Sequence, residues 1–196
     1  KESGNVSMDL VYPQHFQTGI SVDVHPKLTL NADIGWTDYK QWDAFVFRFD
    51  RNLEFLNAAR ILSPDNATPN TLRLPLGFKS QWNWAFGMEF HASSRLDLRA
   101  GVEIRDSVIP DDQRQVMAPF GGANLYSIGM GYQWDKDTEI DMNLSYLHSV
   151  ESIPADTSCN LNCDNITNII YNPYAGLDVK TSLRVVMAGL SFRTKF

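Results

Sequence analysis

Apolar residues recur at every second position in several parts of the chain. In residues 15–24, Phe16, Ile20 and Val22 share one face, and Gln17 and Ser21 lie on the other. Residues 28–36 repeat this pattern after a connection of only three residues, His25-Pro26-Lys27. A period of two is typical of a β-strand, and so short a connection predicts an antiparallel hairpin.

The same alternation returns five more times along the chain. It occurs in residues 82–90, 96–104, 126–134, 140–146 and 180–196. The opposite faces of these segments are rich in Gly, Ser, Asn and Gln, with isolated charges of both signs. We therefore predict seven antiparallel strands, each with one apolar and one polar face.

The connections alternate between short turns and long loops. The long ones cover approximately residues 40–78, 106–123 and 149–178. Such loops are uncommon in a compact soluble domain, whereas membrane β-barrels have short turns on one side and long extracellular loops on the other. Strands of about nine residues also suit a bilayer, which takes ~9–11, better than a soluble sandwich, with ~5–6.

These observations predict an all-β fold, an antiparallel transmembrane β-barrel in a bacterial outer membrane. A soluble sandwich or lipocalin-like barrel is the alternative. Aromatic residues near the strand ends fit the girdles that such barrels place at the two membrane interfaces. The predicted interface aromatics are Trp36, Trp42, Trp82, Trp84, Tyr132, Trp134, Phe192 and Phe196.

The composition of the chain argues against a helical membrane protein and against a nucleic-acid-binding protein. The chain has 196 residues, 43% of them hydrophobic, and a net charge of -6. No apolar run approaches the ~18 residues of a membrane-spanning helix. The acidic balance and the lack of Lys and Arg runs argue against nucleic acid as a partner.

The two cysteines, Cys159 and Cys163, lie four positions apart in a polar segment. Without a neighbouring His or further Cys, a zinc site would lack ligands. A local disulfide is the preferred interpretation, and two free thiols are the alternative.

Two stretches resemble the FadL family of long-chain fatty-acid and hydrocarbon transporters. In PQHFQTGISVDVHPKLTLNADIGWTDYKQW, Pro13 opens a strand, Gly19 lies within it, and a Trp-Thr-Asp-aromatic run ends the next strand. The other stretch, residues 98–148, holds a short acidic and Pro-bearing loop before a hairpin. The aromatic last residue, Phe196, is similar to the assembly signal of outer-membrane barrels.

The resemblance implies a fourteen-stranded monomeric barrel, plugged by an N-terminal hatch, that moves hydrophobic compounds. The seven strands here would match the last seven of the family. A closed bacterial barrel has an even number of strands, and unpaired strand edges in lipid are costly. We therefore expect this chain to be the C-terminal half of a larger barrel. The alternative is that residues 4–11 form an eighth strand that closes a small barrel.

Candidate ligand-binding residues lie on the polar face and in the first long loop. Arg99, Glu103 and Arg105 share a face of one strand and could bind the carboxylate of a fatty acid. A salt-bridge ladder that keeps the lumen polar is the alternative. Phe45, Phe47 and Phe49 alternate in the loop and could form either a surface that captures apolar ligands or a strand extended above the membrane.

No catalytic or metal site is predicted. The residues His15, His91 and His148 lie on different strands without metal-ligand spacing, and no nucleophile has a visible base and orienting partner. No cofactor is implied. The predicted function is passive uptake of hydrophobic small molecules, with a structural or surface-interaction barrel as the alternative. The predicted partners are the bilayer, lipopolysaccharide or detergent, a hydrophobic ligand, and the missing N-terminal half.

Overall fold

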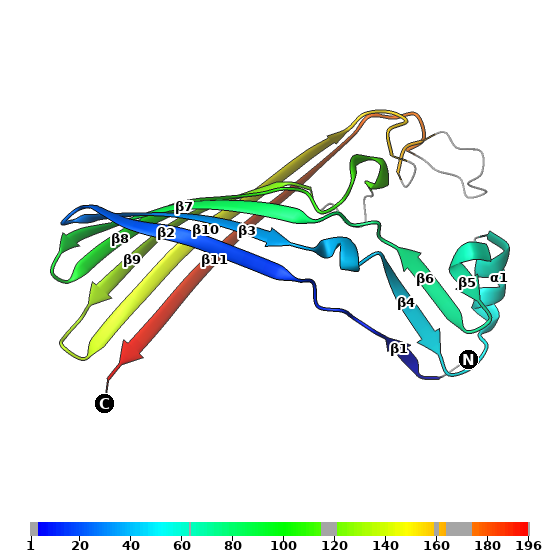
Figure 1. The fold of residues 1–196 in the computed structure, drawn as a ribbon, viewed down its shortest axis with the longest axis horizontal. Helices are drawn as coiled ribbons and strands as arrows, with labels where there is room; N and C mark the ends of the chain where they lie inside the picture. Colours follow the sequence, from blue (N-terminus) through cyan, green and yellow to red (C-terminus); the bar gives the residue numbers. More distant parts are fainter. Residues whose placement is uncertain (1–3, 63, 115–120, 159–160, 164–173, 196) are drawn as a thin grey trace.

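Seven long strands form one antiparallel sheet in the computed structural model, which describes residues 4–62, 64–114, 121–158, 161–163 and 174–195. Their order across the sheet is β11-β10-β9-β8-β7-β3-β2 (Figure 1). The strands are β2 (His15–His25), β3 (Leu28–Thr37), β7 (Gln81–Ser93), β8 (Leu96–Arg105), β9 (Ala123–Gln133), β10 (Thr138–Ile153) and β11 (Val179–Thr194). All seven predicted strands are present, and the predicted all-β fold is confirmed.

The two ends of this sheet differ. Short turns join β2 to β3, β7 to β8 and β9 to β10 at one end, which we call the turn end. The longer connections leave from the other end, which we call the loop end. Within the described residues the sheet is not closed, and β2 and β11 are its edge strands.

A small second sheet extends from the loop end (Figure 1). Its order is β1-β4-β6-β5, and a short helix lies beside β5. The elements are β1 (Val6–Met8), β4 (Ala44–Phe49), α1 (Glu54–Leu62), β5 (Ala67–Thr68) and β6 (Thr71–Pro75). The described residues also contain three short 3-10 helices, η1 (Tyr39–Gln41), η2 (Pro64–Asn66) and η3 (Asp111–Gln113). Residues 6–8 pair with β4 instead of closing the large sheet, so the alternative of an eighth barrel strand is wrong.

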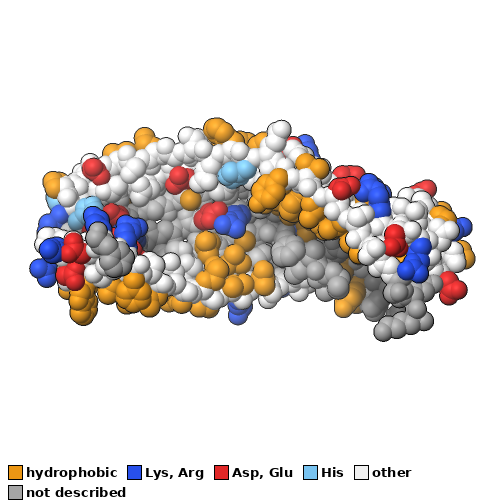
Figure 2. Space-filling view, turned by 90° about the horizontal axis from the view of Figure 1, so that it is seen from below, with side chains coloured by type: hydrophobic (Ala, Val, Ile, Leu, Met, Phe, Trp, Pro, Cys, Tyr) orange, Lys and Arg blue, Asp and Glu red, His pale blue; other side chains and the backbone are white. Residues whose placement is uncertain are grey.

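The large sheet exposes its apolar side chains. On β7, Trp84, Phe86 and Met88 are exposed, while the residues between them are half-buried. The buried apolar side chains of the described residues lie at the loop end or beside the small sheet; they are Leu56, Ala67, Ile109, Ile153 and Leu161. Figure 2 looks onto the hollowed side of the molecule, where acidic and basic side chains gather, with apolar side chains along the outer margins. An apolar outer face without a core beneath it requires lipid as its solvent.

In the described part of the chain, no helix has both the length and the hydropathy needed to cross a membrane.

Candidate ligand-binding site

A hollow of about 560 Å³ lies on the polar face of the large sheet at the loop end. We call it the loop-end hollow. Strands β2, β3, β7 and β8 form its floor, because their alternate residues point to one face. The segment before β2, with Tyr12 and Pro13, and the segment after β3, with Tyr39 and Trp42, form its wall. The lining residues are Tyr12, Pro13, His15, Gln17, Thr37, Tyr39, Trp42, Gln81, Asn83, Ala85, Glu103 and Arg105.

Arg105 is the cation of the loop-end hollow. Its Nε and Nη2 donate to the two carboxylate oxygens of Glu103, at 2.8 and 2.9 Å. The Nδ2 of Asn83 donates to the same carboxylate at 3.2 Å. A guanidinium carries five N–H groups, so three of those on Arg105 have no partner among the described residues. Arg105 is thus oriented by one carboxylate and can still donate to an anionic ligand.

Aromatic rings form the wall beside Arg105. The rings of Tyr39 and Trp42 meet edge to face at 5.3 Å, and Trp42 and Phe45 lie 6.3 Å apart. The indole Nε1 of Trp42 donates to the carbonyl of Val11 at 2.6 Å, which fixes the ring. The contact between Trp42 and Phe45 connects the loop-end hollow to β4 of the small sheet.

The apolar face of the small sheet continues from Phe45. Phe45 is opposite Leu74 and Phe47 is opposite Leu72 in the register of β4 and β6. Phe49 packs edge to face on Phe55 of α1 at 5.9 Å. The three phenylalanines are half-buried, and Leu74, Val6 and Met8 on the same face are exposed. Residues 45–49 therefore form both a strand and a partly open apolar surface, and its role in capture stays a prediction.

Arg99 lies at the opposite end of β8 in a different setting. Its Nε donates to Glu89 at 2.5 Å and its Nη1 to Asp141 at 2.7 Å, while Asp97 lies 4.0 Å away. His91 bonds to Asp97 at 2.7 Å through Nδ1. We call these five residues the turn-end network. Three carboxylates around one guanidinium disfavour an additional ligand carboxylate, so here the geometry favours the salt-bridge ladder.

The turn-end network also contains the only group of possible metal-ligand atoms found among the described residues. Atoms of Glu89, His91 and Asp97 lie within 4.8 Å of one another. Arg99 already places its positive charge against two of these carboxylates. A cation there would have to compete with that guanidinium, so the arrangement does not favour a metal.

The sequence pattern predicts Arg99, Glu103 and Arg105 on one face of a strand. In the structure they do share a face of β8, but Arg99 lies in the turn-end network and the other two lie in the loop-end hollow. Arg99 and Arg105 are six positions apart on β8, roughly 20 Å along an extended strand. Sequence reasoning missed His15, Tyr39 and Asn83. It also missed an apolar strip on the polar face, where Leu125, Leu147 and Val185 align across β9, β10 and β11. The sequence signal for this strip is the presence of apolar residues, such as Val185 and Met187, on the otherwise polar face of β11.

A buried polar cluster ties the long loops together. Arg114 pairs with Glu151 of β10 and donates to Ser107 Oγ at 2.7 Å. Its contact with Asp111, at 2.8 Å, lowers the pKa of that carboxyl from its ordinary value. Asn162 donates to the carbonyls of Pro154 and Leu177, each at 2.7 Å. The loops at this end therefore have a fixed polar core.

The predicted interface aromatics fall into two groups on the outer face. Trp36 and Trp82 are cross-strand partners at the loop end, and Trp84 lies one outward position from Trp82. Tyr132 and Trp134 pack edge to face at 6.3 Å at the turn end, where Phe192 faces Ile140. Trp42 lies instead in the loop-end hollow. Phe196 is outside the described residues, and so is Cys159, so the Cys159–Cys163 disulfide stays a prediction.

Comparison with known proteins identifies relatives. The family described as "Outer membrane protein transport protein (OMPP1/FadL/TodX)" matches residues 1–196. The long-chain fatty acid transport protein of Escherichia coli strain K12 is 29% identical over 72 residues, 37% of this chain and 16% of that protein. A putative outer membrane protein of Neisseria meningitidis serogroup B, NMB0088, is 24% identical over 140 residues, 71% of this chain and 28% of that protein.

Solved structures share the fold. A FadL homologue of Pseudomonas aeruginosa matches with a TM-score of 0.62 at 17% identity, over 93% of this chain and 35% of that one. The toluene transporter TodX of Pseudomonas putida matches with a TM-score of 0.57 at 14% identity, over 98% of this chain and 37% of that one. The chain thus spans little more than a third of these structures. The family description, the Escherichia coli relative and the Pseudomonas putida structure all name transport proteins, which supports the prediction that the chain is not an enzyme.

Proposed function

Because the chain belongs to the outer membrane protein transport protein family (OMPP1/FadL/TodX), we propose that it forms part of a channel for passive uptake of hydrophobic small molecules. The proposed substrates are long-chain fatty acids or hydrocarbons. The relatives named as a long-chain fatty acid transport protein and as a toluene transporter support this class. The remainder of the barrel would come from chain beyond these 196 residues.

The series of ring contacts from Phe45 through Trp42 to Tyr39 carries the proposal, because Trp42 and Tyr39 line the same hollow as Arg105. An apolar ligand would first meet the open face around Phe45, Phe47 and Leu74, which removes part of its surface from water. It would then pass Trp42 and Tyr39 into the loop-end hollow. A volume of about 560 Å³ lies within the ~300–1,000 Å³ of small-molecule sites.

Arg105 would hold the head group of a carboxylated ligand. Its unused N–H groups suit a carboxylate, while the rings of Tyr39 and Trp42 suit the chain that follows. The apolar strip of Leu125, Leu147 and Val185 lies in the same row as Glu103, on strands further along the sheet. This strip would offer an apolar surface to a hydrophobic ligand that leaves the loop-end hollow. Movement of the ligand down its own concentration gradient would drive this passage, so no energy source is proposed.

Uptake by the full-length protein tests the proposal. Liposomes that contain the full-length protein should take up a radiolabelled long-chain fatty acid or an alkane faster than empty liposomes. A hydrophilic sugar of similar mass is the control solute. Uptake at the rate of empty liposomes for fatty acids, alkanes and aromatics alike would exclude the transport function.

A further inference from the structure

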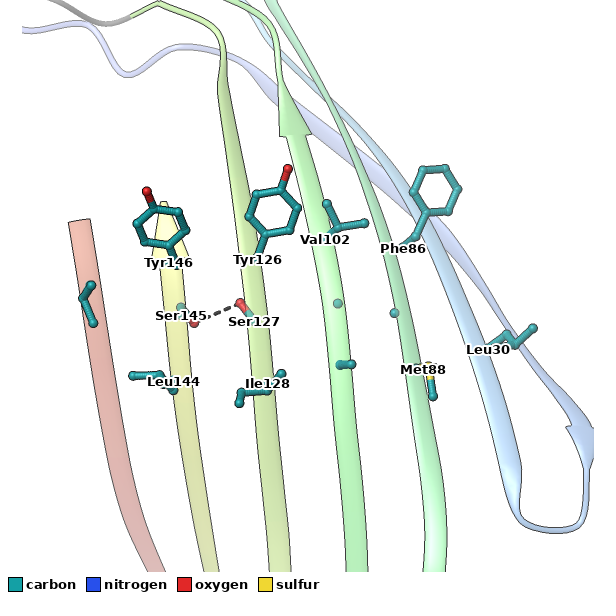
Figure 3. A pocket seen from close by; sticks show the side chains of 14 residues that line it. Leu30, Phe86, Met88, Val102, Tyr126, Ser127, Ile128, Leu144, Ser145 and Tyr146 are labelled. Carbon is teal, nitrogen blue, oxygen red and sulfur yellow. Dashed lines mark hydrogen bonds between the residues drawn. The ribbon is translucent and has the colours of Figure 1, made fainter. Parts of the chain in front are cut away.

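The apolar outer face carries a second hollow, on the side of the sheet opposite the loop-end hollow. It has a volume of about 700 Å³ and lies across β7 to β10, with Leu30 of β3 and Val186 of β11 also in its lining (Figure 3). We call it the outer hollow. Ala100 forms its floor between the larger side chains of Met88 and Ile128, which are its cross-strand partners. A small residue between two long ones leaves a groove in a surface that otherwise presents continuous apolar side chains.

Two tyrosines mark the upper boundary of the outer hollow. Tyr126 and Tyr146 are cross-strand partners, and their hydroxyls point toward the loop end (Figure 3). Tyrosine with an apolar ring below and a hydroxyl above is typical of the membrane interface. The next outward row toward the loop end is polar, with Asn124, His148 and Arg184 in register. The apolar band therefore ends at the two tyrosines on these strands.

Basic side chains follow directly above this boundary. Arg184 and Lys180 are four positions apart on the outer face of β11, and both are exposed. His148, stacked on Tyr146 at 6.0 Å, is the cross-strand partner of Arg184. Ser152 is the partner of Lys180. Neither Arg184 nor Lys180 forms an ion pair within the described residues, in contrast to Arg48, Arg73, Arg99, Arg105, Arg114 and Arg193.

We propose that this surface binds one molecule of lipopolysaccharide through its lipid A portion. An acyl chain fills the outer hollow, and a lipid A phosphate accepts hydrogen bonds from Arg184 and Lys180. In outer-membrane barrels the long loops face outward, so the loop end lies in the leaflet that holds lipopolysaccharide. An apolar groove below two cations that form no ion pair among the described residues matches a lipid with both acyl chains and phosphate. A neutral or zwitterionic lipid carries no net negative charge, so its electrostatic attraction to these two cations is weaker.

Lipid binding by the purified full-length protein tests the proposal. Native mass spectrometry in detergent with chelator would measure binding of lipid A, of dephosphorylated lipid A and of phosphatidylglycerol. We expect the wild type to bind lipid A at least fivefold more tightly than either other lipid. Equal binding of lipid A and its dephosphorylated form would overturn the phosphate contact, and equal binding of phosphatidylglycerol would identify a general anionic-lipid surface instead.

Variants separate the two halves of the site. The double change Lys180→Gln and Arg184→Gln should reduce lipid A affinity at least fivefold. The matched control Lys27→Gln and Lys195→Gln removes two exposed cations from the turn end and should leave the lipid A affinity unchanged.

The change Ala100→Phe fills the outer hollow and should also weaken lipid A binding, while the preference for lipid A over its dephosphorylated form remains. Loss in the control pair to the same degree, or no loss in either test variant, would overturn the proposal. Solute uptake is measured separately, because the outer hollow and the loop-end hollow lie on opposite faces.

Discussion

Two arginines on one face of β8 have different surroundings. Arg99, in the turn-end network, contacts Glu89 and Asp141 and lies near Asp97, so acidic groups exceed basic ones there. Arg105, in the loop-end hollow, contacts only Glu103 among the carboxylates of the described residues and has aromatic neighbours. The same residue type on the same face therefore serves a structural network at one end and is available to a ligand at the other. What differs is the number of carboxylates that other strands contribute: Glu89 from β7 and Asp141 from β10 at Arg99, and none at Arg105 among the described residues.

The largest expected effect is the loss of stability in Arg99→Met. The change removes the guanidinium that joins Glu89, Asp97 and Asp141, whose side chains are about one-third exposed. We expect the free energy of unfolding to fall by about 1–2 kcal/mol, less than for a fully buried network because water screens it. Urea unfolding of the full-length barrel, followed by tryptophan fluorescence, would measure it. Arg105→Met is the matched control, and an equal loss there would remove the distinction between the two ends.

Trp42→Ala tests the aromatic wall of the loop-end hollow. The change removes the contacts with Tyr39 and Phe45 and the bond to Val11, so uptake of fatty acid and alkane should both fall about tenfold. The control is Trp82→Ala, which removes the same residue type from the outer face. If both variants reduced uptake equally, the effect would belong to barrel assembly and not to the hollow.

Arg105→Met should affect one ligand class more than the other. Loss of the guanidinium should weaken uptake of a long-chain fatty acid about three- to tenfold and leave that of an alkane of equal length nearly unchanged. Competition between the two labelled ligands in the same liposomes gives the ratio directly. An unchanged ratio would mean that Arg105 belongs to a structural ladder, as Arg99 does.

The smallest expected effect concerns Asp135, in the turn between β9 and β10. Asp135 accepts backbone N–H bonds from Asp137 and Thr138, at 2.9 and 2.8 Å, and these lower its pKa from the ordinary value. A lowered pKa stabilises the fold above the unfolded value near 3.8, and this contribution is lost as the pH falls through the folded value. Asp135→Asn should therefore show a slightly smaller fall in Tm between pH 6 and pH 3 than the wild type. An identical fall would contradict this contribution.

The sequence predicted the large sheet well because each strand carries its own pattern. The alternation in residues 82–90 is local, so it identifies both the strand and its lipid-facing side without any partner. The small sheet was harder, since β1 and β4 are about 40 positions apart and pair only through the fold. Phe45, Phe47 and Phe49 showed alternation, but the sequence does not say whether such a strand joins a barrel or stands above it.

The candidate site was predicted only in part, for a similar reason. Periodicity places Arg99 and Arg105 on the polar face, but the two carboxylates that hydrogen-bond to Arg99 come from other strands, Glu89 from β7 and Asp141 from β10. Trp42 was assigned to the membrane interface because tryptophans gather there, whereas its bond to Val11 holds it in the loop-end hollow. Side-chain direction within a strand is thus a property of the sequence, because the backbone repeats every two residues. The partners of a side chain depend on strand register, which only the tertiary structure decides.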